Sequence, residues 1–307
     1  MNNEVISIDL GSNSFRVLKY DCLNHEVISD YHEVVGTADG LVDTGLISNA
    51  AQKRIIKALK QSIEKVKYEP SIAVAVTTAA MRKASNNQEV LKNIKENTGV
   101  KFTIIDGLEE ARLTLVAVKQ ALKREKINSS KFILLDIGGG STEIIVNTED
   151  DYVSHSFDFG IVTMTQEFLE HHDLHKDLDL KKIEIKKHLD SLHLNLGEYT
   201  FVATAGTPTT IAAVKLGQDY FSYDKDIVNG TIVDLKDLSN CLDIIKNSTK
   251  EEITNLVGRG KVEFIQVGIY IYRAIFEVLE KNESIVLDDG LREGVAINHC
   301  LKQKCEG

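Results

Sequence analysis

Residues 136–141 read Asp-Ile-Gly-Gly-Gly-Ser, and residues 9–14 read Asp-Leu-Gly-Ser-Asn-Ser. Each stretch follows an apolar run, and apolar residues resume shortly after it. A buried strand that ends in Asp and turns through Gly, twice in one chain, predicts two related halves. Glycine lets backbone N–H groups approach a ligand closely, and successive N–H groups form a concave anion site. The two stretches therefore predict a pair of phosphate-binding turns, each with a carboxylate beside it.

Length and element order predict an α/β protein of two domains. The chain has 307 residues, which suits two domains of about 150 residues each. Strand-like and helix-like segments alternate, and each glycine turn is flanked by two strand-like runs that predict a hairpin. The polar segment after residue 124 connects to the second copy. We therefore expect an N-terminal domain over residues 1–125 and a C-terminal domain over 126–307, with the last helix free to pack back on the first domain.

Charge and composition exclude several classes of protein. A net charge of −10 argues against a nucleic-acid-binding surface, and an anionic substrate would need local attraction from a positively lined cleft or a metal ion. No apolar run reaches the roughly 18 residues that span a bilayer, and the N-terminus lacks a basic signal region. Cys22, Cys241, Cys300 and Cys305 show no CxxC spacing. We expect reduced thiols and a cytoplasmic protein that does not bind membranes.

Two carboxylates flank the second glycine turn. If this turn closes a hairpin, Asp136 and Glu143 face the same side and could hold Mg²⁺ or another divalent cation through oxygen ligands and water. The alternative interpretation is a glycine turn with ordinary solvated acids. Because Asp9 repeats the pattern in the first copy, we favour the functional interpretation.

Three further segments carry candidate functional groups. Glu109 and Glu110 follow a strand and turn, where one of them could position an attacking water, although acids in a first helical turn also complement the helix dipole. Arg82 follows another strand, and its guanidinium suits bidentate phosphate contact. Gly206 and Thr207 precede Pro208, which is placed for a first helical position. This segment is either a simple helix start or a further anion-binding helix terminus.

The combination resembles the exopolyphosphatase/guanosine pentaphosphate phosphatase family, in its short two-domain form. The resemblance covers about residues 4 to 298 and rests on six motifs in the family's order. These are residues 9–16 (Asp-Leu-Gly-Ser-Asn-Ser-Phe-Arg), 77–82 with Asn86, 107–112 (Gly-Leu-Glu-Glu-Ala-Arg), 136–143, 206–207 and 290–294 (Gly-Leu-Arg-Glu-Gly). The family's basic, glycine-rich stretch near the first helix is Gly36-Thr37-Ala38-Asp39-Gly40 here, without Arg or Lys.

The resemblance implies an actin-like fold, with two ribonuclease-H-like domains around a central cleft. It implies that Glu110 is the base that activates water, and that Asp136 and Glu143 hold the metal ion and assist the base. We add Asp9, from the first copy of the motif, as a further candidate metal ligand. The implied phosphate-binding residues are Ser12, Asn13, Ser14, Arg82, Gly138, Gly139, Gly140, Ser141, Gly206 and Thr207.

The predicted activity is metal-dependent removal of orthophosphate from the end of inorganic polyphosphate. The first alternative is hydrolysis of the 5′ γ-phosphate of guanosine pentaphosphate. A second is a non-catalytic sensor that binds guanosine tetra- and pentaphosphate, and a third is a sugar or acid kinase of the same fold, disfavoured by the Glu-Glu-Ala-Arg segment. The oligomeric state is left open, with a homodimer as one option.

Overall fold

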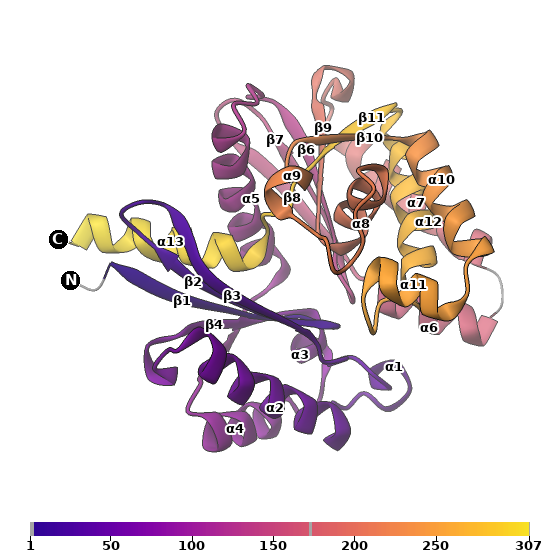
Figure 1. The fold of residues 1–307 in the computed structure, drawn as a ribbon. Helices are drawn as coiled ribbons and strands as arrows, with labels where there is room; N and C mark the ends of the chain where they lie inside the picture. The colour runs from indigo at the N-terminus through magenta and orange to yellow at the C-terminus, as the bar shows by residue number, and fades with distance from the viewer. Residues whose placement is uncertain (1–2, 172–173, 307) are drawn as a thin grey trace. The chain divides into compact units, whose positions relative to one another are not determined.

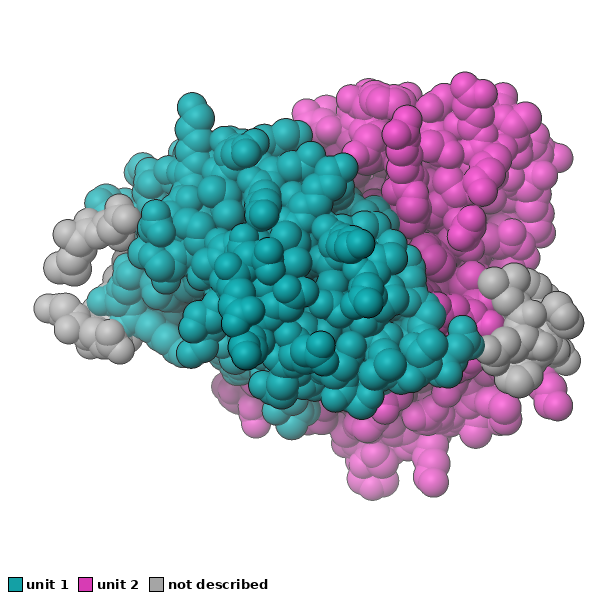
Figure 2. Space-filling model, turned by 90° about the horizontal axis from the view of Figure 1, so that it is seen from below, with its two compact units in different colours: residues 1–118, 289–307 teal, residues 119–288 magenta. Residues whose placement is uncertain are grey.

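In the computed structural model, the chain divides into two units inside one helix, α5 (Gly107–Arg124; Figure 1). Unit 1 comprises residues 1–118 and 289–307, and unit 2 comprises residues 119–288 (Figure 2). The structure describes residues 3–171 and 174–306. The sequence-based domain boundary at 125/126 lies directly after α5, whereas the division between the units falls within this helix.

Unit 1 is built on a five-stranded sheet in the order β3-β2-β1-β4-β5. The first three strands form an antiparallel meander, and β4 and β5 continue from β1 in parallel. The strands are β1 (Glu4–Leu10), β2 (Ser14–Asp21), β3 (Glu26–Val34), β4 (Val74–Thr77) and β5 (Phe102–Ile104). Besides the first part of α5, the helical segments are α1 (Leu41–Thr44), α2 (Asn49–Val66), η1 (Pro70–Ile72), α3 (Ala79–Lys83), α4 (Asn87–Thr98) and α13 (Leu291–Glu306).

Helices cover both faces of the unit 1 sheet, with α13 on one face and α2 and α4 on the other (Figure 1). The α2 helix begins where the sequence predicts, because the Ser48 hydroxyl accepts a hydrogen bond from the Ala51 N–H. Its apolar face, including Ile55 and Leu59, is fully buried. The short helix α3 was not expected, and it carries Arg82.

Two of the cysteines are oxidised, so the expectation of four reduced thiols was wrong. Cys22, directly after β2, and Cys300 in α13 form a disulfide with a Cα–Cα distance of 5.4 Å. The pairing depends on α13 packing against β1 and β2, which residues 278 positions apart do not reveal in the sequence. Cys241 is a buried free thiol, and the side chain of Cys305 lies outside the described part of the chain. A cytoplasmic location therefore no longer follows from the cysteines.

Unit 2 is built on a six-stranded sheet in the order β10-β11-β9-β6-β7-β8. Its strands are β6 (Phe132–Ile137), β7 (Thr142–Asn147), β8 (Tyr152–Phe157), β9 (Thr200–Thr204), β10 (Thr231–Asp234) and β11 (Glu283–Val286). Its helical segments are α6 (Ile161–His171), α7 (Leu174–Ser191), η2 (Leu196–Glu198), α8 (Gly206–Lys215), α9 (Lys225–Val228), α10 (Leu235–Asn247), α11 (Lys250–Val257) and α12 (Ile265–Leu279). The buried helix α12 packs against α6, α7, α8 and α10 around one apolar core.

The two sheets share one topology. Strands β8, β7, β6, β9 and β11 follow the same order as β3, β2, β1, β4 and β5, with the same antiparallel and parallel pairings among the first four. This order confirms the predicted α/β fold of two ribonuclease-H-like units. Within the described residues, no helix combines the length and the hydrophobicity needed to cross a bilayer.

Candidate active-site groups in the two units

The predicted site residues of each unit lie just beyond the carboxyl ends of the parallel strands of its sheet. In unit 1, Leu10 pairs with Thr77 and Thr77 pairs with Ile104, so the first glycine turn, α3 and α5 all follow strand ends at the same edge. In unit 2, Asp136 pairs with Thr204, so the second glycine turn and α8 do the same. Ligands of open α/β sheets bind outside these strand ends.

The first glycine turn is held by a loop that follows β3. The Gly11 N–H donates to the Ser14 carbonyl at 2.9 Å and closes the turn. The Asn13 carbonyl accepts from Val35 and Gly36, and the Ser12 carbonyl accepts from the Ala38 N–H, at 2.8–3.0 Å. With these carbonyls occupied, the turn has a fixed conformation, as an anion-binding turn requires.

Arg54 supplies a cation to this loop that the sequence reasoning missed. From α2, its guanidinium donates to the carbonyls of Val35 and Gly36 at 2.6 and 3.0 Å and to the Asp39 carboxylate at 2.6 Å. The segment 36–40 contains no basic residue of its own, so a charge from another element takes that place. A basic residue on the next amphipathic helix was the available signal, but the sequence does not give its direction.

The candidate base and a candidate phosphate ligand form an ion pair within unit 1. The Arg82 Nη1 atom lies 2.7 Å from Glu110 Oε2 and donates to the Ile105 carbonyl at 2.9 Å. The Glu110 side chain is 12% exposed and that of Arg82 is 21% exposed. Arg82 therefore orients the Glu110 carboxylate at the strand edge.

Glu109, the neighbour of Glu110 in the sequence, forms an ion pair with Arg112 instead of Arg82. Arg112 donates to both Glu109 oxygens at 2.7 and 2.8 Å and lowers the pKa of this carboxyl, mainly through these hydrogen bonds. Arg112 also donates to the Asn298 amide oxygen of α13 at 3.1 Å. The two glutamates thus have different partners: Glu109 holds Arg112, which links α5 to α13, and Glu110 lies beside Arg82.

A close helix contact supports the position of α5. A Cβ atom on Gly294 of α13 would lie 1.9 Å from the Leu113 carbonyl oxygen, one turn after Glu110. Only glycine allows this approach. The neighbouring Arg292 and Glu293 form a buried ion pair at 2.5 Å, and Arg292 also contacts Asp30 at 3.2 Å. The 290–294 motif is therefore part of the unit 1 scaffold.

The second glycine turn repeats the construction of the first. The Gly138 N–H donates to the Ser141 carbonyl at 3.0 Å. The carbonyls of Gly138 and Gly139 accept from Ile161 and Val162, at the start of α6, at 3.0 and 2.8 Å. A Cβ atom on Gly160 would lie 2.5 Å from the Gly138 carbonyl oxygen, so glycine is required for this close packing.

A row of polar side chains crosses the unit 2 sheet at this turn. Asp136 pairs with Thr204 on one side and with Glu143 on the other, and Glu143 pairs with Ser156. Residues in register point to the same face of a sheet. Glu143 is 1% exposed, and its Oε1 accepts from the Ser156 hydroxyl at 2.6 Å. Ser156 was missed because its relation to Glu143 depends on the β7–β8 register.

The Asp136–Glu143 pair fits a divalent cation. Like charges directly opposite each other destabilise a sheet, and a buried carboxylate is costly without compensation. A divalent cation would relieve this repulsion, and Mg²⁺ is typically held by one or two carboxylates together with water and substrate phosphates. Among the described residues this pair belongs to no cluster of three or more His, Cys, Asp or Glu side chains suited to a metal. Water or phosphate oxygens would therefore complete the coordination.

The start of α8 has a strained backbone. Ala205 adopts φ 75° and ψ −176°, a conformation that favours glycine, and it directly precedes Gly206. Pro208 is the third residue of the helix rather than the first, contrary to the sequence-based expectation. The Thr207 side chain packs against Gly268 of α12, and backbone N–H groups at the start of a helix suit an anion such as phosphate.

The chain has two ribonuclease-H-like units, and in each a glycine turn held by backbone hydrogen bonds follows the end of a strand. These features define a protein of the actin-like fold. The chain belongs to the Ppx/GppA phosphatase family, whose model matches residues 19–303. A crystal structure of the Aquifex aeolicus family member is 27% identical, with a TM-score of 0.72 and 98% coverage of both chains.

Two curated relatives carry different activity names. A putative exopolyphosphatase of Haemophilus influenzae is 29% identical over 95% of this chain and 90% of its own length. A guanosine-5′-triphosphate,3′-diphosphate pyrophosphatase of Aliivibrio fischeri is 27% identical over 94% of this chain and 58% of its own. The chain spans about half the length of several curated relatives, between 44% and 59%. Family membership indicates a phosphatase, and the names of the two relatives differ in the substrate that they give.

Proposed function

We propose that the chain is an exopolyphosphatase, which hydrolyses the terminal phosphoanhydride bond of inorganic polyphosphate and releases orthophosphate. The observation that carries this proposal is the carboxylate of Glu110, held at the strand edge by the 2.7 Å ion pair with Arg82. A binding protein needs no such positioned base. The choice of polyphosphate is supported by the Haemophilus influenzae relative, which the chain matches over 90% of its length.

In this proposal Glu110 accepts a proton from the attacking water. The water oxygen forms a bond to the terminal phosphorus while the bond from this phosphorus to the bridging oxygen breaks. The shortened polyphosphate leaves as an oxyanion, and the released product is orthophosphate. Phosphoryl transfer depends mainly on alignment and charge neutralisation. In unit 1, backbone N–H groups of the turn at 12–14 and Arg82 would bind phosphate oxygens. In unit 2, backbone N–H groups of the turn at 138–141 and of the start of α8 at Gly206 would do the same.

Asp136 and Glu143 would hold Mg²⁺, and Ser156 would orient Glu143 through its 2.6 Å hydrogen bond. When bound, the ion would neutralise charge on the phosphate oxygens. Asp9 is kept as a further candidate ligand from the first copy of the motif.

The alternative substrate is guanosine pentaphosphate, supported by the name of the Aliivibrio fischeri relative. Hydrolysis of its 5′ γ-phosphate would use the same groups. A non-catalytic sensor would bind guanosine tetra- and pentaphosphate without turnover, and in such a protein Glu110 would have no chemical role.

One assay separates these functions: orthophosphate release by the purified chain in Mg²⁺ from long-chain polyphosphate, tripolyphosphate and guanosine pentaphosphate in parallel. The exopolyphosphatase proposal expects the highest kcat/KM with polyphosphate. The Glu110→Gln variant is the control for contaminating phosphatases, because it removes the base and keeps the shape of the side chain.

Preference for guanosine pentaphosphate would replace the proposed substrate with the alternative one. Tight nucleotide binding without release of phosphate from any of the three substrates would identify a sensor. Equal rates for the wild-type chain and Glu110→Gln would contradict the assigned base.

A further inference from the structure

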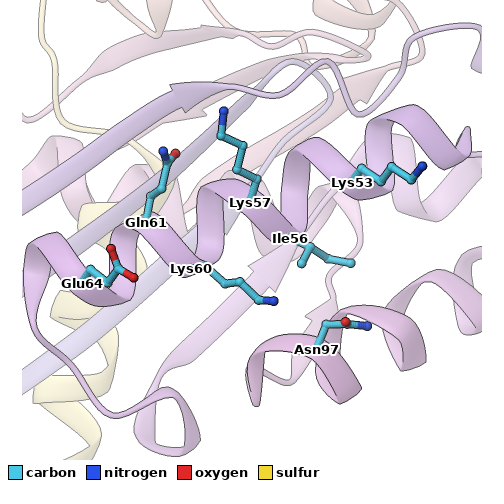
Figure 3. Close-up of a pocket in the computed structure, with 7 residues that line it drawn as sticks. All are labelled: Lys53, Ile56, Lys57, Lys60, Gln61, Glu64 and Asn97. Carbon is cyan, nitrogen blue, oxygen red and sulfur yellow. The ribbon is translucent and has the colours of Figure 1, made fainter.

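The outer face of α2 carries a hollow of about 400 Å³ that the proposed chemistry does not use. Figure 3 shows side chains of α2 around it, with one residue of α4 beside them. Its lining consists of Lys53, Ile56, Lys57, Lys60, Gln61, Glu64 and Asn97. We call it the α2 groove.

Three lysines of the α2 groove form a stripe along the helix. Lys53, Lys57 and Lys60 are spaced four and three residues apart, which places them on one helical face. The stripe extends over about 10 Å, given the rise of an α-helix. The opposite face of α2 is anchored in the core of unit 1 through Ile55 and Leu59. The lysines therefore project from a rigid base.

These lysines have few counter-charges beside them in the described part of the chain. In the part of the chain that the structure describes, none of the three forms an ion pair, whereas Lys19, Lys182 and Lys215 each do. The seven lining residues include a single carboxylate, Glu64. In a chain of net charge −10, an uncompensated basic stripe is the kind of local field that attracts a polyanion against the overall repulsion.

The lining favours a phosphate chain over a nucleic acid. Proteins that bind single-stranded nucleic acids combine basic grooves with aromatic side chains on which bases stack. None of the seven lining residues is aromatic, and Ile56 is the one apolar member. Inorganic polyphosphate offers repeated charge without bases, and lysine ammonium groups bind it without a stacking platform.

We propose that the α2 groove is an exosite for the polyphosphate chain, separate from the catalytic groups. The proposal rests on the proposed function, because it concerns the same substrate. Arg54 of the same helix contacts the loop that braces the first glycine turn, so α2 supports both sites within unit 1. The exosite adds affinity for long polyphosphate chains. It adds none for tripolyphosphate, because this short substrate binds the catalytic groups alone.

The test compares wild type with the triple variant Lys53→Gln, Lys57→Gln, Lys60→Gln. Dissociation constants for long-chain polyphosphate and for tripolyphosphate are measured in EDTA at several salt concentrations, and hydrolysis of both is measured in Mg²⁺. The triple variant should bind the long chain about tenfold more weakly, with a salt slope shallower by about 2, as loss of three counterion-releasing contacts predicts. Tripolyphosphate affinity and kcat should not change.

The matched control is Lys186→Gln, Lys187→Gln, Lys246→Gln, which changes net charge equally through exposed lysines of unit 2. It should retain wild-type affinity for the long chain. Equal long-chain affinity for wild type and the α2 variant overturns the exosite. Single-stranded DNA that binds wild type as tightly as polyphosphate, and loses this affinity in the α2 variant, overturns the ligand class.

The same data keep the two proposals apart. Hydrolysis of tripolyphosphate by wild type, together with equal long-chain affinity for wild type and the α2 variant, retains the proposed function and rejects the exosite. Loss of long-chain binding in the α2 variant, with no hydrolysis of any polyphosphate by wild type, retains the groove as a polyphosphate site and rejects the proposed function.

Discussion

The two sheets share a backbone design but place different side chains in it. The row that crosses unit 2 at the glycine turn is Thr204, Asp136, Glu143 and Ser156. The corresponding row in unit 1 is Val76, Asp9, Arg16 and His32. The aspartate is common to both rows, but its cross-strand partner is a cation in unit 1 and a second carboxylate in unit 2.

This difference assigns separate tasks to the two units. Opposite charges across an antiparallel pair stabilise it, whereas two carboxylates directly opposite each other repel, and a bound divalent cation would relieve that repulsion. Unit 2 is therefore the better candidate for a metal site, and unit 1 carries the candidate base on α5. In the proposed function, a duplicated fold would keep two candidate phosphate-binding turns and divide the remaining chemistry between the units.

The largest effect on activity is expected at Glu110, the candidate general base in unit 1. Glu110→Gln should lower kcat about 10²- to 10⁴-fold, the usual contribution of a general base. Polyphosphate binding and thermal stability should change little. The matched control is Glu109→Gln, which removes charge from the residue paired with Arg112 and should keep most of the activity. A larger loss of kcat in the control would reverse the roles assigned to the two glutamates.

The second effect compares the two aspartates directly. Asp136→Asn should raise the Mg²⁺ concentration for half-maximal activity by about 10- to 100-fold, and Asp9→Asn should raise it less. Without Mg²⁺, Asp136→Asn should also stabilise unit 2 by about 0.2–1 kcal/mol, because it relieves repulsion with Glu143. Denaturant titration in EDTA measures this change. Identical Mg²⁺ titrations for the two variants would contradict the assignment of the metal site to Asp136 of unit 2 in preference to Asp9 of unit 1.

The two units also differ in their cysteines: unit 1 contains the Cys22–Cys300 disulfide, whereas Cys241 of unit 2 is a free thiol. Reduction, or Cys22→Ser, should destabilise unit 1 by about 2–4 kcal/mol. Denaturant unfolding with and without a reductant measures the change, and Cys241→Ser should retain the response to the reductant. A midpoint that does not depend on the reductant in wild type would show that the Cys22–Cys300 bond contributes nothing to stability.

The smallest expected effect is a pH dependence of the stability of unit 2. Burial, with a smaller contribution from nearby His155, holds the pKa of His188 below its ordinary value of 6.5. The unfolded chain therefore binds this proton more readily, so stability should fall as pH drops below 6.5 and level off below the folded pKa. His188→Gln should reduce this slope in thermal unfolding between pH 5 and about 7. An unchanged slope would exclude His188 as its source.

The fold and the site differ in how much of each was predictable. Short-range patterns placed the two glycine-turn hairpins and the Ser48-capped helix, because strand alternation and capping act over a few residues. They also placed Asp136 opposite Glu143, because a hairpin fixes its own register. Arg54, Ser156 and the Cys22–Cys300 bond were missed, because each depends on an element that packs from a distant part of the chain.

Helix α13 has a consequence for biosynthesis. It supplies Gly294, Asn298 and Cys300 to unit 1, although the ribosome makes it after unit 2. Domains usually fold in the order of their synthesis, yet here the sheet of unit 1 must wait for a helix that is made after all of unit 2. Premature termination shortly before residue 289 would therefore spare unit 2 and leave unit 1 unfinished.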